Sequence, residues 1–302
     1  MRFKSHKGGK TLSVSSNKKL IEYLEKESLI RKVDEDTLRI GSYIILKTAQ
    51  GWRLIKDSKE LGTYPKAIIK EDRVLLAKNM GMLLEVTPQR HREILSIHKA
   101  RLIAGVCGDG SLSTKGTFEM KFINSDDNLL KMYIEALEKV YGIRKPSILY
   151  DYRKGKPVAH VKVTRQSIVE DVYKYCKKRG AKYWVVPLEY LDREAAIEFL
   201  SFYYSCDGSY DYRPRKGTRE IIFKSCSLNA LHGIKRLLET HLGAESHFRK
   251  PEYDKRRGEL YYRLVVSRVD NLRKLFLHGF TSYRTDHQRV LNEIKRWALG
   301  ES

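Results

Sequence analysis

The sequence predicts an α+β fold in which one α-β-β-α-β-β-α unit occurs twice, behind a small N-terminal domain. The first observation is a repeated tract: RLIAGVCGDGSL at 101–112 returns roughly one hundred residues later as EFLSFYYSCDGSYD at 198–211. Each tract is an apolar, small-residue-rich helix that runs into Asp-Gly-Ser. The second observation is that helix starts and stops recur at nearly the same offset, at Ser125 and Ser227, Gly142 and Gly243, Thr164 and Ser267, and Gly180 and Gly279.

Both copies show the same succession of periodic patterns. The first copy predicts a helix at 88–108 entered by Thr87-Pro88, a strand at 117–124, a helix at 126–141, a hairpin at 146–164 and a helix at 165–179. The second predicts the same elements at 193–206, 218–226, 228–242, 245–267 and 268–278, followed by a C-terminal helix near 284–298. Hairpins between helices indicate antiparallel sheets covered by helices on one face.

The repeat divides the chain into three predicted domains, 1–86, 87–190 and 191–302. Residues 1–86 lie outside the repeat and show a charged helix near 17–32, then short strands as in SYIILKTAQGWRLI. Their basic residues suit an accessory nucleic-acid module, and a folding or docking domain is an equal alternative. A winged-helix domain is a third and weaker alternative for residues 1–86.

Charge is the strongest compositional signal. The 302 residues include 59 Lys and Arg against 37 Asp and Glu, a formal net charge of +22. Such an excess indicates a polyanionic partner, because Lys and Arg on phosphates release condensed counterions. The chain has no bilayer-length apolar run and no apolar signal core, and its four cysteines form no C-x-x-C pair. We therefore expect a soluble, cytoplasmic, nucleoid-associated protein without a membrane partner, zinc or disulfides.

Two acids are the candidate catalytic and metal-binding residues. Asp109 and Asp207 each end one of the two small-residue helices. Small side chains let helices approach closely, here through Ala104, Gly105 and Gly108 on one helix and Ser201, Ser205 and Cys206 on the other. Two carboxylates brought together at helix C-termini repel each other unless a cation lies between them, and Mg²⁺ (or Mn²⁺) suits oxygen ligands beside a phosphate.

The two tracts resemble the paired motifs of the LAGLIDADG homing endonucleases, in their monomeric two-motif form. Residues 102–110 fit the nine-residue pattern and residues 200–208 fit it less well, because Ala104 and Phe202 stand where the pattern has glycine. The bulky Phe202 suggests a shifted helix packing that uses Ser201 and Ser205. The resemblance implies that Asp109 and Asp207 bind the catalytic metals. It also implies that two saddle-shaped antiparallel sheets, related by a pseudo-twofold axis, lie in the DNA major groove.

Further candidates follow from strand position. The resemblance implies polar residues near the metals, and the ends of the repeated strands offer Lys121, Asn124, Lys224 and Ser225. Three basic hairpin tips with interleaved Tyr, and the polar positions of the strands, supply the candidate DNA contacts: Arg153, Lys154, His160, Lys162, Arg213, Arg215, Lys216, His247, Arg249, Arg256, Arg257 and Arg263.

The sequence thus predicts a monomeric, Mg²⁺-dependent, site-specific endonuclease that hydrolyses both strands of a long pseudo-palindromic double-stranded DNA target. The resemblance adds cleavage across the minor groove with short 3′ overhangs, and an intron as the genetic home. The alternative is a binding protein derived from such a nuclease. That protein is either a maturase whose partner is intron RNA or a DNA-binding regulator.

Overall fold

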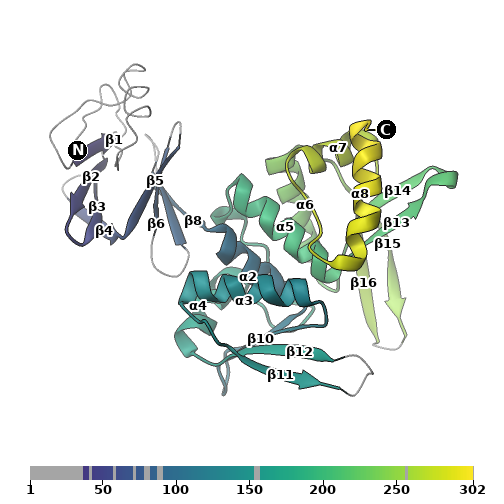
Figure 1. Cartoon of the computed structure of the whole chain (residues 1–302), viewed down its shortest axis with the longest axis horizontal. Helices are drawn as coiled ribbons and strands as arrows, with labels where there is room; N and C mark the ends of the chain where they lie inside the picture. The colour runs from purple at the N-terminus through teal and green to yellow at the C-terminus, as the bar shows by residue number, and fades with distance from the viewer. Residues whose placement is uncertain are drawn as a thin grey trace. The chain divides into compact units, whose positions relative to one another are not determined.

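The computed structural model describes residues 37–40, 43–56, 59–70, 73–77, 82–86, 91–152, 157–255 and 258–301. The chain falls into two compact units, Met1–Ser96 and Ile97–Ser302 (Figure 1). Among the described residues, no helix has both the length and the apolar character that crossing a bilayer requires. The division into three domains stays a prediction.

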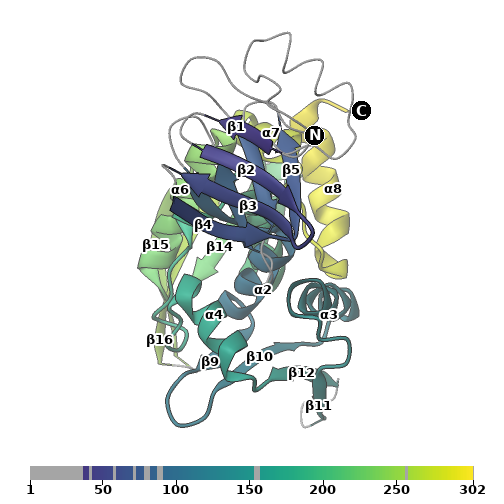
Figure 2. The ribbon, with the colours of Figure 1, turned by 90° about the vertical axis from the view of Figure 1, so that its left-hand side faces the viewer.

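The described part of the N-terminal unit consists of two antiparallel meanders, of which Figure 2 shows the first face-on. One sheet has the order β1 (Thr37–Ile40), β2 (Tyr43–Thr48), β3 (Gly51–Lys56) and β4 (Lys59–Tyr64); the other has β5 (Lys66–Lys70), β6 (Arg73–Ala77), β7 (Met82–Val86) and β8 (His91–Leu95). Ile45, Leu54 and Tyr64 are fully buried. Strands β2 and β3 confirm the predicted short strands, whereas the helix expected near 17–32 lies outside the described residues.

The predicted start of the first repeated helix is wrong. The helix begins at Ile97, and residues 91–95 form β8, which pairs with β7 along its whole length. Ile94 and Leu95 are buried in the N-terminal unit. A short apolar segment fits a strand as well as a helix, so periodicity alone does not distinguish the two. Here residues 91–95 form a strand because they pair with the edge of β7.

The second unit confirms the predicted order α-β-β-α-β-β-α, twice. The first copy consists of α2 (Ile97–Cys107), β9 (Gly110–Ser113), β10 (Glu119–Asn124), α3 (Asp127–Tyr141), β11 (Ser147–Asp151), β12 (Val158–Val163) and α4 (Gln166–Cys176). The second consists of α5 (Arg193–Asp207), β13 (Gly208–Arg213), β14 (Thr218–Ser225), α6 (Leu228–Leu242), β15 (His247–Asp254), β16 (Glu259–Val266) and α7 (Val269–Leu277). The expected C-terminal helix is α8 (Thr285–Leu299).

The helix ends follow the predicted caps in part. Gly142 and Gly243 end α3 and α6 in the left-handed region, with φ of 70° and 62°, and the Ser227 hydroxyl caps α6. Helix α3 is capped by Asp126 rather than Ser125, because the Asp126 carboxylate accepts from two backbone N–H groups of the first turn. Helices α4 and α7 begin one residue later than predicted, after Arg165 and Arg268, without side-chain caps.

The two sheets have one topology. Their orders are β11-β12-β10-β9 and β15-β16-β14-β13, all antiparallel. Gly110 lies opposite Phe122 in the first sheet and Gly208 opposite Phe223 in the second, so the register makes Phe122 and Phe223 equivalent. Both phenylalanines are buried on the helix-covered face. Because side chains alternate along a strand, the residues next to them lie on the opposite face, called the outer face here.

The close packing of α2 against α5 runs through glycine. A Cβ on Gly108 would lie 2.5 Å from the Cβ of Cys206, and one on Gly105 would lie 3.0 Å from the ring of Phe202. The side chain of Phe202 thus fits over Gly105, which explains how this bulky residue is accommodated at a helix crossing. At the start of the interface, Arg101 Nε donates to Glu198 Oε1 at 2.7 Å.

The expectation that α5 packs on α2 through Ser201 and Ser205 is wrong. These serines face the segment between α7 and α8. The Ser201 hydroxyl accepts from Thr281 N at 3.2 Å, and the Ser205 hydroxyl accepts from Tyr283 N at 2.8 Å. Ser201 and Ser205, four residues apart, therefore face one neighbour of α5, and Phe202 and Cys206 form the side that meets α2.

We predict that Gly108→Ala destabilises the protein by roughly 1–3 kcal/mol, because the added methyl overpacks against Cys206. The double substitution Gly108→Ala with Cys206→Gly exchanges the crowding and the space, so it recovers part of the loss. Urea unfolding measures both free energies. A Gly108→Ala variant as stable as the wild type would contradict the close approach.

Candidate active site

The α2–α5 interface places the two predicted acids at the same end of the helix pair. Asp109 lies two residues after the end of α2 and immediately before β9, while Asp207 is the last residue of α5 and immediately precedes β13. Asn124, at the end of β10, donates from Nδ2 to Asp109 Oδ2 at 2.7 Å. Its Oδ1 accepts from Asp126 N at 2.9 Å, so the amide group has one orientation and its NH₂ group faces Asp109.

The carboxyl groups of Asp109 and Asp207 lie close enough for the charge of Asp207 to change the pKa of Asp109. The pKa of Asp109 is raised to about 7, first by burial and next by the negative charge of Asp207. Burial, and with it the charge of Asp207, also raises the pKa of Tyr203. A cation bound beside the two carboxyl groups would neutralise their negative charges, so this place favours cation binding.

Two cations that the sequence did not single out lie around Asp109. Lys178 is only 3% exposed, and its ammonium group donates to the carbonyl oxygens of Val106 and Cys107 at 2.6 and 2.8 Å. It thereby satisfies carbonyls that the end of α2 leaves without helical partners, and it offsets the negative end of the helix dipole. The positive charges of Arg284 and Lys178 lower the pKa of Asp109 and so partly offset the rise that burial and Asp207 cause.

No sequence signal reveals these two cations. Lys178 belongs to a basic segment after α4, and a lysine at such a place is ordinarily a solvated surface residue. Arg284 precedes α8, and the contacts of the neighbouring Tyr283 with α5 and of Thr285 with Asp126 hold this segment in place.

The side chains at the helix ends fit a hard divalent cation. The donors are two carboxylates, and no group of three or more His, Cys, Asp or Glu with metal-binding geometry occurs among the described residues. Mg²⁺ commonly takes one or two carboxylates and completes its shell with water and phosphate oxygens. Asp109 and Asp207 would hold it, with Asn124 fixing one oxygen of Asp109.

The four strand-end candidates divide between the two faces. Asn124 and its register equivalent Ser225 lie on the helix side; Ser225 is buried and its hydroxyl accepts from Ser227 N at 3.0 Å. Lys121 and Lys224 lie on the outer face, and Lys121 forms an ion pair with Glu119 at 2.5 Å. The register sets Lys121 opposite Lys162 and Lys224 opposite Arg263, so the two lysines are not equivalent.

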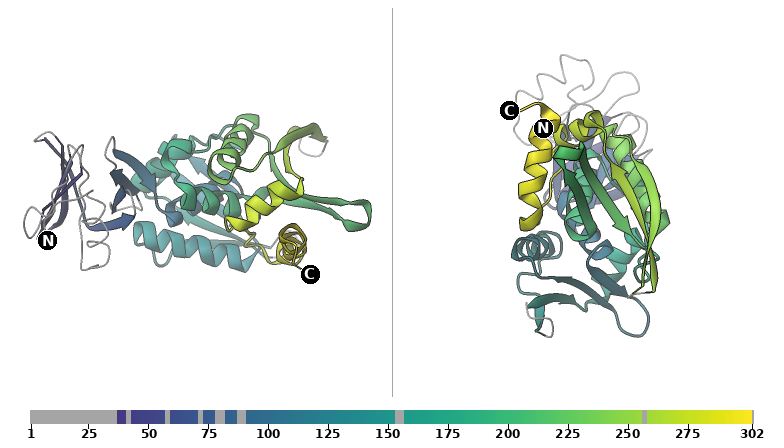
Figure 3. Two further views of the ribbon diagram at one scale, coloured as in Figure 1. Left: turned by 90° about the horizontal axis from the view of Figure 1, so that it is seen from above. Right: turned by 90° about the vertical axis from the view of Figure 1, so that its right-hand side faces the viewer.

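Most predicted DNA-contact residues on the strands share the outer face. His160 and Lys162 lie there in the first sheet, and His247, Arg249 and Arg263 in the second. Arg215 and Lys216 are exposed in the short turn (Pro214–Lys216) between β13 and β14, and this hairpin extends beyond the helices (Figure 3). Arg213 forms an ion pair with Asp211 at 2.6 Å. Arg153, Lys154, Arg256 and Arg257 lie outside the described residues.

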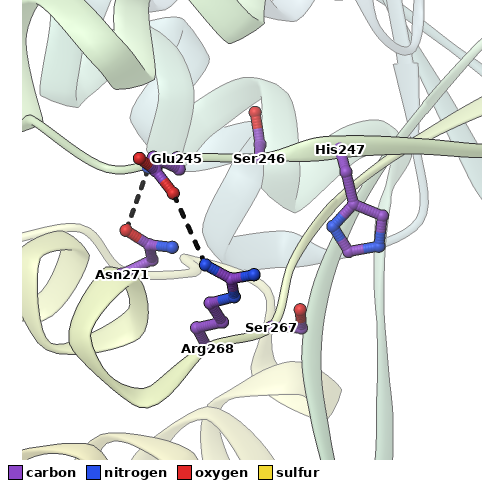
Figure 4. Close-up of a pocket in the computed structure, with 6 residues that line it drawn as sticks. All are labelled: Glu245, Ser246, His247, Ser267, Arg268 and Asn271. Atoms are coloured by element: carbon purple, nitrogen blue, oxygen red, sulfur yellow. Dashed lines mark hydrogen bonds and ion pairs between the residues drawn. The ribbon is translucent and has the colours of Figure 1, made fainter.

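Two cavities border these residues. One of about 420 Å³ is lined by His160, Asp151 and the exposed Leu149, Tyr150 and Tyr152. The other, of about 320 Å³, lies where β15 begins near the start of α7, and His247 lines it (Figure 4). There Glu245 N donates to Asn271 Oδ1 at 3.0 Å, and Arg268 lies 3.9 Å from the Glu245 carboxylate.

The α-β-β-α-β-β-α arrangement occurs twice in the Ile97–Ser302 unit. The first helices of the two copies pack together, and an acidic residue lies at the end of each. Residues 194–278, most of the second copy of the repeat, match the family described as LAGLIDADG-like domain. The second copy of the repeat is thus similar to a LAGLIDADG-like domain.

Solved structures with similar folds share little sequence with the chain. Full-length DUF199/WhiA from Thermatoga maritima is 15% identical (TM-score 0.45, covering 68% of this chain and 61% of that one). The homing endonuclease I-WcaI bound to its DNA recognition sequence is 12% identical (TM-score 0.45, 65% and 85%). The N-terminal LAGLIDADG domain of DUF199/WhiA is 13% identical (TM-score 0.42, 64% and 86%). No curated protein matches the chain in sequence.

The raised pKa of Asp109 predicts a pH-dependent stability in metal-free protein. The folded state holds a proton up to about pH 7, whereas the unfolded chain releases it near the ordinary value of 3.8. The stability from this group is therefore present below pH 3.8 and is lost as the pH rises to about 7. Between pH 5 and pH 8 we expect the wild type to lose roughly 1–3 kcal/mol that Asp109→Asn does not lose.

Urea unfolding in EDTA at the two pH values measures the difference. Asp270→Asn, an exposed position on α7, serves as the control and should follow the wild type. Equal pH dependence in the wild type and Asp109→Asn would contradict the raised pKa.

Proposed function

We propose that the chain is a site-specific endonuclease that cleaves both strands of double-stranded DNA with a divalent cation, Mg²⁺ or Mn²⁺. The observation that carries the proposal is the meeting of Asp109 and Asp207 at the ends of two packed helices, in a protein with a formal charge of +22. Both acids come from one chain, so a monomer suffices for the site.

Each residue around the acids has a role that its contacts support. Asp109 and Asp207 hold the cation, which supplies stabilisation of the negative charge on the scissile phosphate and makes water a better nucleophile. Asn124 keeps Asp109 in one orientation through its amide hydrogen bond. Lys178 neutralises the carbonyl end of α2, and together with Arg284 it favours the ionised carboxylate that a cation requires.

The two sheets would bind the DNA. Their outer faces carry Lys, Arg and His side chains on related strands, and the exposed turn between β13 and β14 adds Arg215 and Lys216. A β-ribbon enters the major groove, where polar side chains read base edges and long cations bind phosphates. Two similar sheets favour a pseudo-palindromic target of about 20 base pairs, with one half for each sheet.

The second candidate is a binding protein that has lost cleavage. Such a protein would be a DNA-binding regulator or, with intron RNA as its partner, a maturase. Basic outer faces serve these functions equally well, so cleavage is what separates the two candidates.

We expect Asp109→Asn and Asp207→Asn each to reduce cleavage by roughly 100-fold or more, because each removes a charged ligand of the cation. DNA affinity should stay nearly unchanged. The substrates are duplexes selected from a random library by binding to the wild type, incubated with Mg²⁺, Mn²⁺ or EDTA, and cleavage and gel-shift affinity are measured on the same duplexes.

The control is Asp270→Asn, which lies on α7 away from both aspartates in the fold. Bound duplexes that the wild type leaves intact with either metal would overturn the nuclease and support the regulator. Tighter binding of the gene's intron RNA than of any selected duplex, again without cutting, would support the maturase.

A further inference from the structure

The outer faces of the two sheets share a carboxylate at the same position. Because Phe122 and Phe223 are equivalent in register, Glu119 and Glu220, three residues before them, are equivalent as well. Both point away from the helix-covered face, since their neighbours Met120 and Ile221 are buried on it. A basic surface built only for phosphate has no use for an acid there, because phosphates repel carboxylates.

Each of these carboxylates is held by cations of the same face. Glu119 forms ion pairs at 2.5 Å with Lys121 on its own strand and with Lys162 on β12. Glu220 accepts from Arg249 of β15 at 2.5 Å. Hydrogen bonds from Lys121, and next from Lys162, hold the pKa of Glu119 below its usual range. This carboxylate is thus an acceptor at neutral pH.

Glu220 also retains an unused acceptor. It is 8% exposed, and its Oε2 is buried with no hydrogen-bond partner in the described part of the chain. A buried carboxylate oxygen without a donor is costly and is ordinarily satisfied by a partner. Because this oxygen is itself covered, a donor from a ligand on the outer face reaches it once the Glu220 side chain turns outward.

The combination of carboxylate and cation matches one base pair in the major groove. Guanine offers two acceptors, O6 and N7, to Lys or Arg, and cytosine offers the N4 amino donor to Glu. Pairing also lowers non-specific affinity, because a cation held by a carboxylate releases fewer counterions from DNA than a free one.

We propose that Glu119 and Glu220 are specificity-determining residues. Each selects a G·C base pair at the equivalent position of one half of the DNA target, and each reduces binding to non-target DNA. The proposal rests on the proposed binding of double-stranded DNA by the outer faces, whether or not the protein cleaves it.

The test is selection from a random-sequence duplex library with the full-length wild type, Glu119→Gln and Glu220→Gln. Glutamine keeps the shape and removes the charge. The wild type should enrich a pseudo-palindrome with a G·C pair in each half. Each variant should lose discrimination at one of these pairs, in opposite halves, by roughly tenfold to 100-fold. Glu138→Gln, an ion-paired position on α3, is the control and should retain the wild-type consensus.

A second measurement separates specificity from a merely structural ion pair. The affinity for random duplex DNA should rise in both variants, with a steeper dependence on salt, because Lys121, Lys162 and Arg249 are released to phosphates. Variants with the wild-type consensus and salt dependence would overturn this proposal alone. A wild type that enriches no duplex would remove the proposed function and this proposal together.

Discussion

The structure of the second unit depends on the close approach of α2 and α5. Gly108 against Cys206 and Gly105 beneath the ring of Phe202 bring the two backbones together, and the ends of the helices follow. The resulting proximity of Asp109 and Asp207 is electrostatically unfavourable on its own. Three interactions nevertheless hold the helices in this arrangement. They are the packing of apolar surface along the interface, the Arg101–Glu198 ion pair and the Lys178 cap at the end of α2. A site held in an unfavourable charge state by packing is ready to bind a cation.

The two copies differ at positions where they would meet a ligand. At equivalent strand ends, Asn124 contacts Asp109, whereas Ser225 is buried and engaged by Ser227. Lys121 and Lys224 occupy different register positions on the outer faces. The duplication therefore preserves the backbone and the acids while it varies the surrounding polar groups, which suits a target whose two halves are similar but not identical.

Local signals in the sequence were sufficient for much of this fold. The repeated Asp-Gly-Ser tracts and the glycine stops predicted the order of elements and both acids, because caps and turns are decided by neighbouring residues. Alternation along β12, β15 and β16 likewise placed His160, His247 and Arg263 on the outer face. What the sequence missed depends on distant partners. Residues 91–95 form a strand because they pair with β7. Ser201 and Ser205 contact the loop before α8, and Lys178 is buried against the end of α2.

The most direct test of the central claim is whether Asp109 and Asp207 form one shared cation site. Binding of Mn²⁺ at pH 8, followed by electron paramagnetic resonance, compares the wild type with Asp109→Asn, Asp207→Asn and the double variant. A shared site predicts that either single substitution weakens binding almost as much as both together. Free-energy losses that simply add, or Mn²⁺ binding that neither substitution changes, would contradict it.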